Sequence, residues 1–265
     1  MLDIQNLRIS FCDRVAVDCM NLTIEHGQSL AIVGESGSGK SITALAAMGL
    51  LPNTATVQGK ILYDGEDVIG MSPRRLQTFR GTHIAMIFQE PMTSLNPVFT
   101  IGEQVMETIL THEPTTRRDA RMKAICALEE VGIEATRFGS YPHEFSGGMR
   151  QRVLIAIALT CKPNLLIADE PTTALDTATS MQVVDLLRDL QQDRGMAIMF
   201  ITHDLCIVPS IAQTICVMQS GKIVEKGETR SVLQTPKHHY TRALASCTPS
   251  FTTKLRRLPT IEDFC

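Results

Sequence analysis

Residues 29–41 read Ser-Leu-Ala-Ile-Val-Gly-Glu-Ser-Gly-Ser-Gly-Lys-Ser, and this stretch decides the fold. Its beginning, Ser29–Val33, is a short apolar run that predicts a buried parallel strand, because strands covered on both faces lack polar alternation. Its end leads into Lys40–Leu50, which is rich in Ala and Leu and predicts a helix. Gly34–Ser41 lies between them and fills every fixed position of the pattern G-x-x-x-x-G-K-[ST].

The loop between this strand and this helix has the residue types that a phosphate cradle needs. Glycine permits the backbone that curls N–H groups around phosphate oxygens, and the helix directs its positive end at the same anion. We expect Lys40 to reach the β- and γ-phosphates and the Ser41 hydroxyl to hold Mg²⁺. Glycine–serine loops are also common turns, but the strand before and the helix after favour a phosphate site. The expected binding residues are Gly34, Glu35, Ser36, Gly37, Ser38, Gly39, Lys40 and Ser41.

A second apolar strand ends in two carboxylates. Leu165-Leu-Ile-Ala leads directly into Asp169 and Glu170. At the tip of a strand beside the phosphate loop, Asp169 can bind Mg²⁺ directly or through water. Glu170 then lies one residue further on, where it can polarise an attacking water. Paired acids can instead cap the following turn, but the phosphate loop favours the catalytic interpretation.

Two neutral polar residues end further strands. His203 follows the apolar run Met199–Thr202 and can hydrogen-bond a γ-phosphate. Gln89 follows Ile84–Phe88 and can contact Mg²⁺ or water through its amide. Each residue alone is a weak signal. Their positions after strands of one predicted sheet favour roles in the same site.

Composition excludes several classes of protein. The chain has 265 residues, with 25 Lys and Arg against 28 Asp and Glu, so it lacks the basic footprint of a nucleic-acid-binding protein. No apolar run approaches the roughly 20 residues that cross a bilayer. The first ten residues lack the basic and then apolar order of an export signal. We therefore expect a cytosolic globular protein without a nucleic-acid partner.

The eight cysteines form no C-x-x-C pair, and without an export signal disulfides are not expected. Cys126, Cys206 and Cys216 have apolar neighbours in the sequence. We expect each to be a reduced thiol that packs as a small hydrophobic side chain.

Strands and helices alternate along most of the chain, which predicts an α/β fold. The alternation also predicts a mostly parallel sheet in this domain. A helical stretch interrupts the alternation and predicts an inserted helical subdomain at about residues 95–160. Expected strands are Leu2–Phe11, Ala16–Ile24, Ser29–Val33, Ile61–Tyr63, Ile84–Phe88, Asn164–Ala168, Ala197–Thr202, Thr214–Met218 and Lys222–Glu225. Expected helices after residue 140 are Met149–Thr160, Thr177–Asp193 and Asp204–Ala212.

Together these residues resemble the ATP-binding subunits of ABC transporters. Ser146-Gly-Gly-Met-Arg-Gln151 is similar to the signature segment of that family, and it precedes the Asp-Glu strand as the family requires. The resemblance implies a D-loop at Ala174–Asp176 and an aromatic at Phe11 that stacks on adenine. It spans residues 1–245 and leaves 246–265 as a C-terminal tail. The fold that it implies is a P-loop NTPase (RecA-like) core with a mixed sheet, an N-terminal antiparallel β subdomain and the inserted helical subdomain. ATP and Mg²⁺ are the implied cofactors.

Within this family, three stretches resemble the oligopeptide, dipeptide and nickel importer branch. They are residues 88–97, residues 145–152 and residues 236–244. One departure is Met149, where the signature usually has Gln. Another is the tail, whose two cysteines, Cys247 and Cys265, are too few for the four-cysteine iron–sulfur cluster of many branch members. We therefore expect no cluster.

The resemblance also implies an assembly. ATP would lie between two head-to-tail ATP-binding subunits, with Glu170 from one and Ser146, Gly147, Gly148 and Met149 from the other. Whether these subunits are identical or different stays open. Two integral-membrane permeases and a solute-binding protein would complete the complex at the cytoplasmic face of a bacterial inner membrane. Residues 90–99, after Gln89, are the candidate permease-facing surface.

Several other functions are compatible with parts of the pattern. Di- or oligopeptides are the leading cargo, and nickel or glutathione are alternatives. A soluble ABC-type ATPase acting on DNA or ribosomes shares the core but usually carries coiled coils, zinc modules or a second core. A small-molecule kinase shares the phosphate loop but has no use for Ser146–Met149. A subunit that only binds ATP would not need Glu170 and His203.

Overall fold

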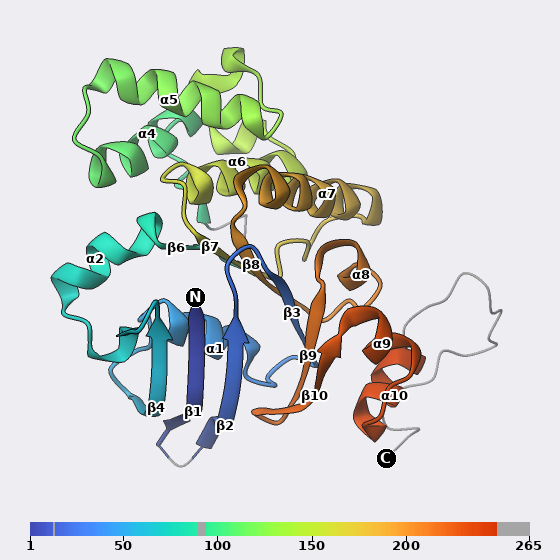
Figure 1. The fold of residues 1–265 in the computed structure, drawn as a ribbon. Coiled ribbons are helices and arrows are strands. Elements are labelled where there is room, and N and C mark those ends of the chain that lie inside the picture. Colours follow the sequence, from blue (N-terminus) through green and yellow to red (C-terminus); the bar gives the residue numbers. More distant parts are fainter. Residues whose placement is uncertain (13, 90–93, 248–265) are drawn as a thin grey trace. The chain divides into compact units, whose positions relative to one another are not determined.

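The computed structural model describes residues 1–12, 14–89 and 94–247 (Figure 1). These residues form two compact units. The first unit joins Met1–Gly70 to the described residues from Met199 onward, and the second unit is Met71–Ile198.

The first unit begins with an antiparallel sheet. Its strands are β1 (Leu2–Phe11), β2 (Arg14–Ile24), β4 (Ala55–Tyr63) and β5 (Glu66–Asp67), in the order β2-β1-β4-β5. A short 3₁₀ helix, η1 (Val68–Gly70), follows β5. Buried residues alternate with less buried ones on each side of an irregularity between Ile4 and Leu7, as period-two side-chain orientation requires. The expected antiparallel β subdomain is confirmed.

A second set of strands in this unit carries the phosphate loop. β3 (Ser29–Val33) is entirely buried and pairs in parallel with β9 (Thr214–Gln219), which pairs antiparallel with β10 (Lys222–Glu228). β8 (Ala197–Thr202) lies on the other side of β3, and the chain re-enters this unit within it. Parallel and antiparallel pairs together give the expected mixed sheet. The helices of this unit are α1 (Lys40–Ala47), α8 (Val208–Ile211), α9 (Thr229–Gln234) and α10 (His239–Ser246).

Helix α8 is shorter than the expected Asp204–Ala212. The Asp204 side chain accepts a hydrogen bond from the backbone N–H of Cys206 at 2.8 Å. The backbone N–H of Asp204 in turn bonds the Thr202 hydroxyl at 3.0 Å. Such local side-chain bonds compete with helical ones, so the helix begins only beyond this turn.

The second unit combines two parallel strands with helices. β6 (Ile84–Ile87) pairs with β7 (Leu165–Asp169), with Ile84 opposite Leu165. Helix α2 was not expected from the sequence; its N-cap is Ser72, and its first residue is Pro73. Helices α4, α5 and α6 pack together (Figure 1). The helices, including the short 3₁₀ helices, are α2 (Pro73–Thr82), α4 (Ile101–His112), α5 (Arg117–Glu130), η2 (Ala135–Gly139), η3 (Pro142–Glu144), α6 (Gly147–Leu159) and α7 (Thr177–Arg194).

The environment of the cysteines differs in part from expectation. Cys216 is buried in β9, and burial raises its pKa to about 12, so the thiol stays neutral. Cys126 and Cys206 are exposed, so the prediction was wrong for both. Cys126 lies two residues from the buried Ala124 of α5, and a two-residue step turns a helix towards its other face. Apolar neighbours in the sequence therefore did not identify the buried face.

None of the helices in the described part of the chain has the length and apolar character that crossing a membrane requires.

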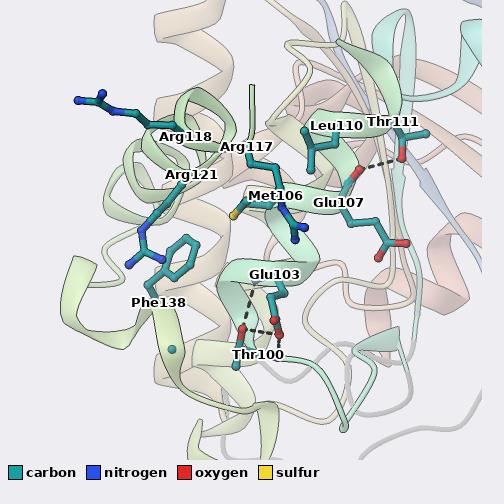
Figure 2. A pocket seen from close by; sticks show the side chains of 11 residues that line it. Thr100, Glu103, Met106, Glu107, Leu110, Thr111, Arg117, Arg118, Arg121 and Phe138 are labelled. Atoms are coloured by element: carbon teal, nitrogen blue, oxygen red, sulfur yellow. Dashed lines mark hydrogen bonds between the residues drawn. The ribbon is translucent and has the colours of Figure 1, made fainter. Parts of the chain in front are cut away.

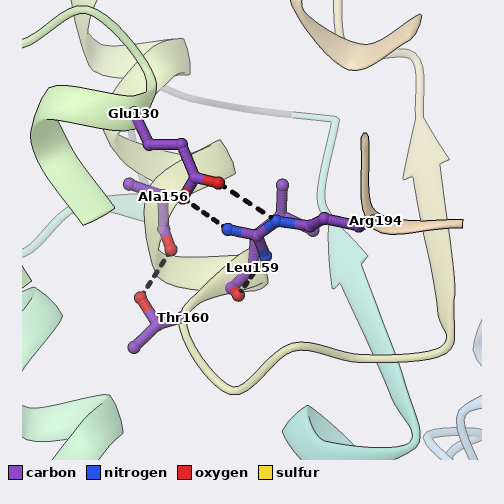
Figure 3. Close-up of polar contacts among 5 residues, drawn as sticks. All are labelled: Glu130, Ala156, Leu159, Thr160 and Arg194. Atoms are coloured by element: carbon purple, nitrogen blue, oxygen red, sulfur yellow. Dashed lines mark hydrogen bonds and ion pairs between the residues drawn. The ribbon is translucent and has the colours of Figure 1, made fainter. Parts of the chain in front are cut away.

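Arg194, at the end of α7, joins three helices of the second unit (Figure 3). Its guanidinium donates to the carboxylate of Glu130, at the end of α5, and to the backbone carbonyl of Leu159 at 2.7 Å. Leu159 is the last residue of α6, where carbonyls lack partners inside the helix. The positive charge of Arg194 is also favourable at this end of α6, which is the negative end of the helix dipole.

We predict that Arg194→Ala lowers the free energy of unfolding by about 1–2 kcal/mol, because the helix-end carbonyl of Leu159 and the Glu130 carboxylate lose a donor that is only 19% exposed. Urea unfolding of the full chain measures the loss. Arg188→Ala on the same helix is the matched control, since Arg188 is 36% exposed and forms a surface ion pair with Asp185. Its effect should stay below about 0.5 kcal/mol. Equal losses in both variants would contradict the role of Arg194.

Candidate active site

The phosphate loop runs from β3 to α1 and has no room for side chains at two glycines. A Cβ on Gly34 would lie 2.2 Å from the carbonyl oxygen of Met218, and one on Gly39 would lie 2.6 Å from that of Ala16. Both glycines have positive φ, 152° and 103°. The fixed glycines of the motif therefore permit close approach to β9 and β2 as well as an unusual backbone.

The amino end of α1 is open to an anion. Its N-cap is Gly39, and no side chain caps the helix. Ser36 and Gly37 are exposed next to it, and the buried Ser38 hydroxyl has no hydrogen-bond partner among the described residues. Uncapped N–H groups at the positive end of a helix dipole favour phosphate.

Lys40 lies over the loop rather than in solvent. It is only 5% exposed, and its Nζ donates to the carbonyl oxygens of Gly34 at 2.8 Å and Glu35 at 2.9 Å. Two backbone carbonyls hold the ammonium group over the loop. A lysine at this place can act as a point charge towards a phosphate group.

Two residues distant in the sequence form hydrogen bonds with the backbone of the phosphate loop. The backbone N–H of Gly221, in the β9–β10 turn, donates to the carbonyl of Ser38 at 3.0 Å. The Tyr240 hydroxyl accepts from the backbone N–H of Glu35 at 3.1 Å. Neither residue was identified from the sequence, since nothing in their spacing links them to the loop.

In the second unit, Gln89 and Glu170 lie together. The Gln89 amide donates to Oε2 of Glu170 at 3.1 Å, and the Thr173 hydroxyl donates to the same oxygen at 2.9 Å. Glu170 is 9% exposed and follows the buried Asp169 at the end of β7. Its φ of 47° is rare for a residue with a side chain and costs about 1–3 kcal/mol. Two donors and a strained backbone thus fix the direction of one carboxylate.

The predicted signature and D-loop also lie together in this unit. Ser146 caps α6 by accepting from the backbone N–H of Met149 at 3.3 Å. A Cβ on Gly148 would lie 2.3 Å from Thr179, and one on Gly147 would lie 3.3 Å from Leu175. Helix α6 therefore begins in close contact with the start of α7.

Asp176 is the N-cap of α7. It accepts from the backbone N–H and the hydroxyl of Thr179 at 3.0 and 2.6 Å. The bond from the Thr179 hydroxyl contributes most, followed by the bond from its backbone N–H, and both lower the pKa of Asp176 below its ordinary value. The carboxylate is therefore charged at neutral pH, and it also favours the positive end of the helix.

The remaining predicted residues are divided between the units. Ser41, Phe11 and His203 belong to the first unit, and Asp169 belongs to the second. Phe11 is half-buried at the end of β1, and His203 is exposed directly after β8. Among the described residues, no cluster of three or more His, Cys, Asp or Glu side chains could hold a metal ion. The predicted magnesium ligands are one hydroxyl, one amide and one carboxylate, from Ser41, Gln89 and Asp169.

A separate hollow of about 700 Å³ lies among α4, α5 and η2 (Figure 2). Several of its side chains already have structural partners. Glu103 and Thr100 form the capping box of α4, and Arg121 lies 4.4 Å from the ring centre of Phe138. Both charge signs line the hollow. It contains none of the predicted catalytic residues.

The contact between Gly148 and Thr179 gives a stability prediction. We expect Gly148→Ala to lower the free energy of unfolding by about 1–3 kcal/mol, because overpacking outweighs the helix preference of alanine. Thr179→Ser should restore stability in the double variant, since it removes the obstructing methyl group and keeps the hydroxyl that bonds Asp176. Thermal unfolding of the single and double variants measures this. An alanine variant as stable as the parent would refute the contact.

Comparison with known proteins gives two family matches. The model described as "ABC transporter" matches residues 17–173, and the one described as "Oligopeptide/dipeptide transporter, C-terminal region" matches residues 224–263. A dimeric ATP-binding cassette, solved in a post-hydrolysis state bound to ADP and Pi, has a TM-score of 0.76 and 26% identity. The similarity covers 87% of this chain and 99% of that one. The expected P-loop NTPase fold is confirmed.

Two relatives align along nearly the whole chain. The dipeptide transport ATP-binding protein DppD of Escherichia coli (strain K12) is 43% identical over 98% of this chain and 82% of its own length. The oligopeptide transport ATP-binding protein OppD of Bacillus subtilis (strain 168) is 45% identical over 94% of this chain and 72% of its own length. Since one family model covers more than half of the sequence and both relatives extend that match, the chain belongs to the ABC transporter family.

Proposed function

We propose that this chain is the ATP-hydrolysing subunit that energises import of di- or oligopeptides through a membrane permease complex. One observation carries the choice of cargo: residues 224–263 match the C-terminal region of oligopeptide and dipeptide transporters. The relatives named for dipeptide and oligopeptide transport support it over 98% and 94% of the chain. In this proposal residues 1–245 are the ATP-binding domain, the helical subdomain spans about 95–160, and 246–265 are a tail.

ATP would bind through the phosphate loop. The open amino end of α1 and the Lys40 ammonium group supply positive charge for the β- and γ-phosphates. Ser36 and Gly37, in the exposed part of the loop, and the buried Ser38 hydroxyl would offer further donors. Phe11, half-buried at the end of β1, would stack on adenine.

Glu170 would be the general base of hydrolysis. Its carboxylate would take a proton from a water molecule as that oxygen attacks the γ-phosphorus and the bond to ADP breaks. Gln89 and Thr173 direct the carboxylate by donating to Oε2. His203 would hydrogen-bond the γ-phosphate.

The predicted ligands suit Mg²⁺ chemically. Mg²⁺ prefers oxygen donors, and the Ser41 hydroxyl, the Gln89 amide and the Asp169 carboxylate all provide them. Asp169 is 4% exposed at the end of β7, so its carboxylate has little competition from bulk water. When bound, the ion would neutralise part of the charge on the phosphates.

A second ATP-binding subunit would complete the site. The signature Ser146-Gly-Gly-Met would act on ATP held by the partner, because its N–H groups lie at the start of a helix that no acidic side chain occupies in its first turn. Asp176 lies next to this segment and would face the same seam. The dimeric state of the solved cassette supports this arrangement.

The other proposed partners are two membrane permeases and a solute-binding protein. Of the candidate permease-facing surface at 90–99, residues 90–93 lie outside the described part of the chain. In the described remainder, Val98 is 70% exposed and Phe99 is 48% exposed. Large apolar side chains gathered at a surface suit a protein partner. The complex would hold this chain at the cytoplasmic face of a bacterial inner membrane.

Glu170→Gln tests the proposed base. The substitution keeps the size of the side chain and its acceptor oxygen but removes the basic carboxylate. We expect kcat for ATP hydrolysis to fall about 10²–10⁴-fold while ATP affinity changes little. Phosphate release and equilibrium nucleotide binding measure the two effects. Glu129→Gln on the exposed face of α5 is the control, and near-normal turnover in Glu170→Gln would exclude it as the base.

Reconstitution tests the proposed cargo. The chain, assembled with the permeases and solute-binding protein of its host in lipid vesicles, should take up labelled di- or oligopeptides only when ATP is supplied. Peptide should also stimulate ATP hydrolysis. Nickel and glutathione are tested in parallel, and uptake of either one without peptide uptake would reject peptide import.

A further inference from the structure

The C-terminal helix α10 contacts the phosphate loop directly. Tyr240 is 2% exposed, and its hydroxyl accepts from the backbone N–H of Glu35 at 3.1 Å across 205 positions of sequence. Burial, the larger cause, raises the pKa of Tyr240 above its ordinary value. The phenol therefore stays neutral over the physiological range and keeps this bond.

The bond falls on a peptide unit that also holds Lys40. The N–H of Glu35 and the carbonyl of Gly34 belong to one planar peptide and point in opposite directions. Tyr240 binds the N–H, and Lys40 Nζ binds the carbonyl oxygen at 2.8 Å. Fixing one end of the plane fixes the direction of the other, so Tyr240 determines where one of the two carbonyl acceptors of Lys40 points.

This peptide needs an external partner to hold it. Gly34 has a φ of 152°, and glycine allows many orientations of the peptide that follows it. The buried hydroxyl is a partner that the loop itself does not supply. Without it, several orientations of the 34–35 peptide would compete, and each would move the acceptor away from the ammonium group.

Tyr240 is itself anchored to the strand behind the loop. Glu225, in β10, accepts from the backbone N–H groups of Lys237 and His238 at 2.9 and 3.0 Å, just before α10 begins. Burial raises the pKa of Glu225. The Thr241 side chain and these two N–H groups lower the pKa by more than burial raises it, so the pKa of Glu225 is below its ordinary value. Glu225 lies opposite Val217, next to the Met218 that touches Gly34. These contacts connect β10 to α10, α10 to the phosphate loop, and the loop to β9, which pairs with β10.

We infer that Tyr240 is a positioning residue for ATP binding, which holds the Gly34–Glu35 peptide so that Lys40 meets the phosphates. The inference rests on the proposed role of the phosphate loop. It makes residues 224–247, within the region matched to peptide transporters, part of the nucleotide site of the same chain. Glu225 supports that position from behind.

Tyr240→Phe tests the inference, because it removes only the hydroxyl. We expect the Kd and KM for ATP of the full chain to rise about two- to tenfold, the effect of one neutral hydrogen bond, with kcat within about twofold. Tyr63→Phe is the matched control, since Tyr63 is also buried, at 4% exposed, but lies in β4. Its Kd and KM should not change. Equal effects in both variants, or none in Tyr240→Phe, would overturn the inference.

Two further variants separate the outcomes. Lys40→Ala should weaken ATP binding at least about tenfold, the loss of a charge-assisted contact. If it does and Tyr240→Phe does not, the inference fails while the proposed site stands; unchanged affinity in Lys40→Ala rejects both.

Glu225→Gln should raise Kd less than Tyr240→Phe does, and the double variant should show less than the product of the two effects. If the Kd change in the double variant equals the product of the two single changes, Glu225 does not act through Tyr240.

Discussion

The phosphate loop must turn its N–H groups outward, and this requirement governs much of the first unit. A loop that offers donors to a ligand has few of its own groups left to stabilise it, so the support comes from behind. Gly34 contacts β9, Gly39 contacts β2, and Gly221 bonds the carbonyl of Ser38. The glycines of the motif therefore serve the packing of the loop as much as its conformation, and their substitution would displace strands as well as the cradle.

The carboxylate half of the site follows a different rule. Glu170 has a left-handed backbone, which normally favours glycine, and Thr173 and Gln89 bind one of its oxygens. A turn of this kind lowers stability, so the surrounding bonds must hold it. The bonds fix the direction of the Glu170 carboxylate, and a base is effective only when its oxygen faces the proton that it removes. Local strain at this position is consistent with a residue selected for chemistry.

The sequence predicted the elements with continuous local signals. β1, β3 and β8 have the expected bounds, because the pattern of apolar residues that predicts each strand lies within the strand itself. It missed α2, which has little apolar periodicity, and shortened β4, whose first residues are half-buried or exposed. Exposure of Cys126 and Cys206 depended on which helix face or turn packs inward. Tyr240 was missed for a related reason: its contact with Glu35 joins residues that only the tertiary fold brings together.

The division of the predicted site between two units has a thermodynamic consequence. The groups proposed to bind phosphate, around Lys40, and the groups proposed to activate water, around Glu170, are each held by bonds within their own unit. Tyr240 and Glu225 are inferred to act on the first group, whereas Gln89 and Thr173 bond Glu170 in the second. Affinity and turnover should therefore respond to different substitutions in this protein. Loss of both properties from one substitution would indicate damage to the fold and not to either group.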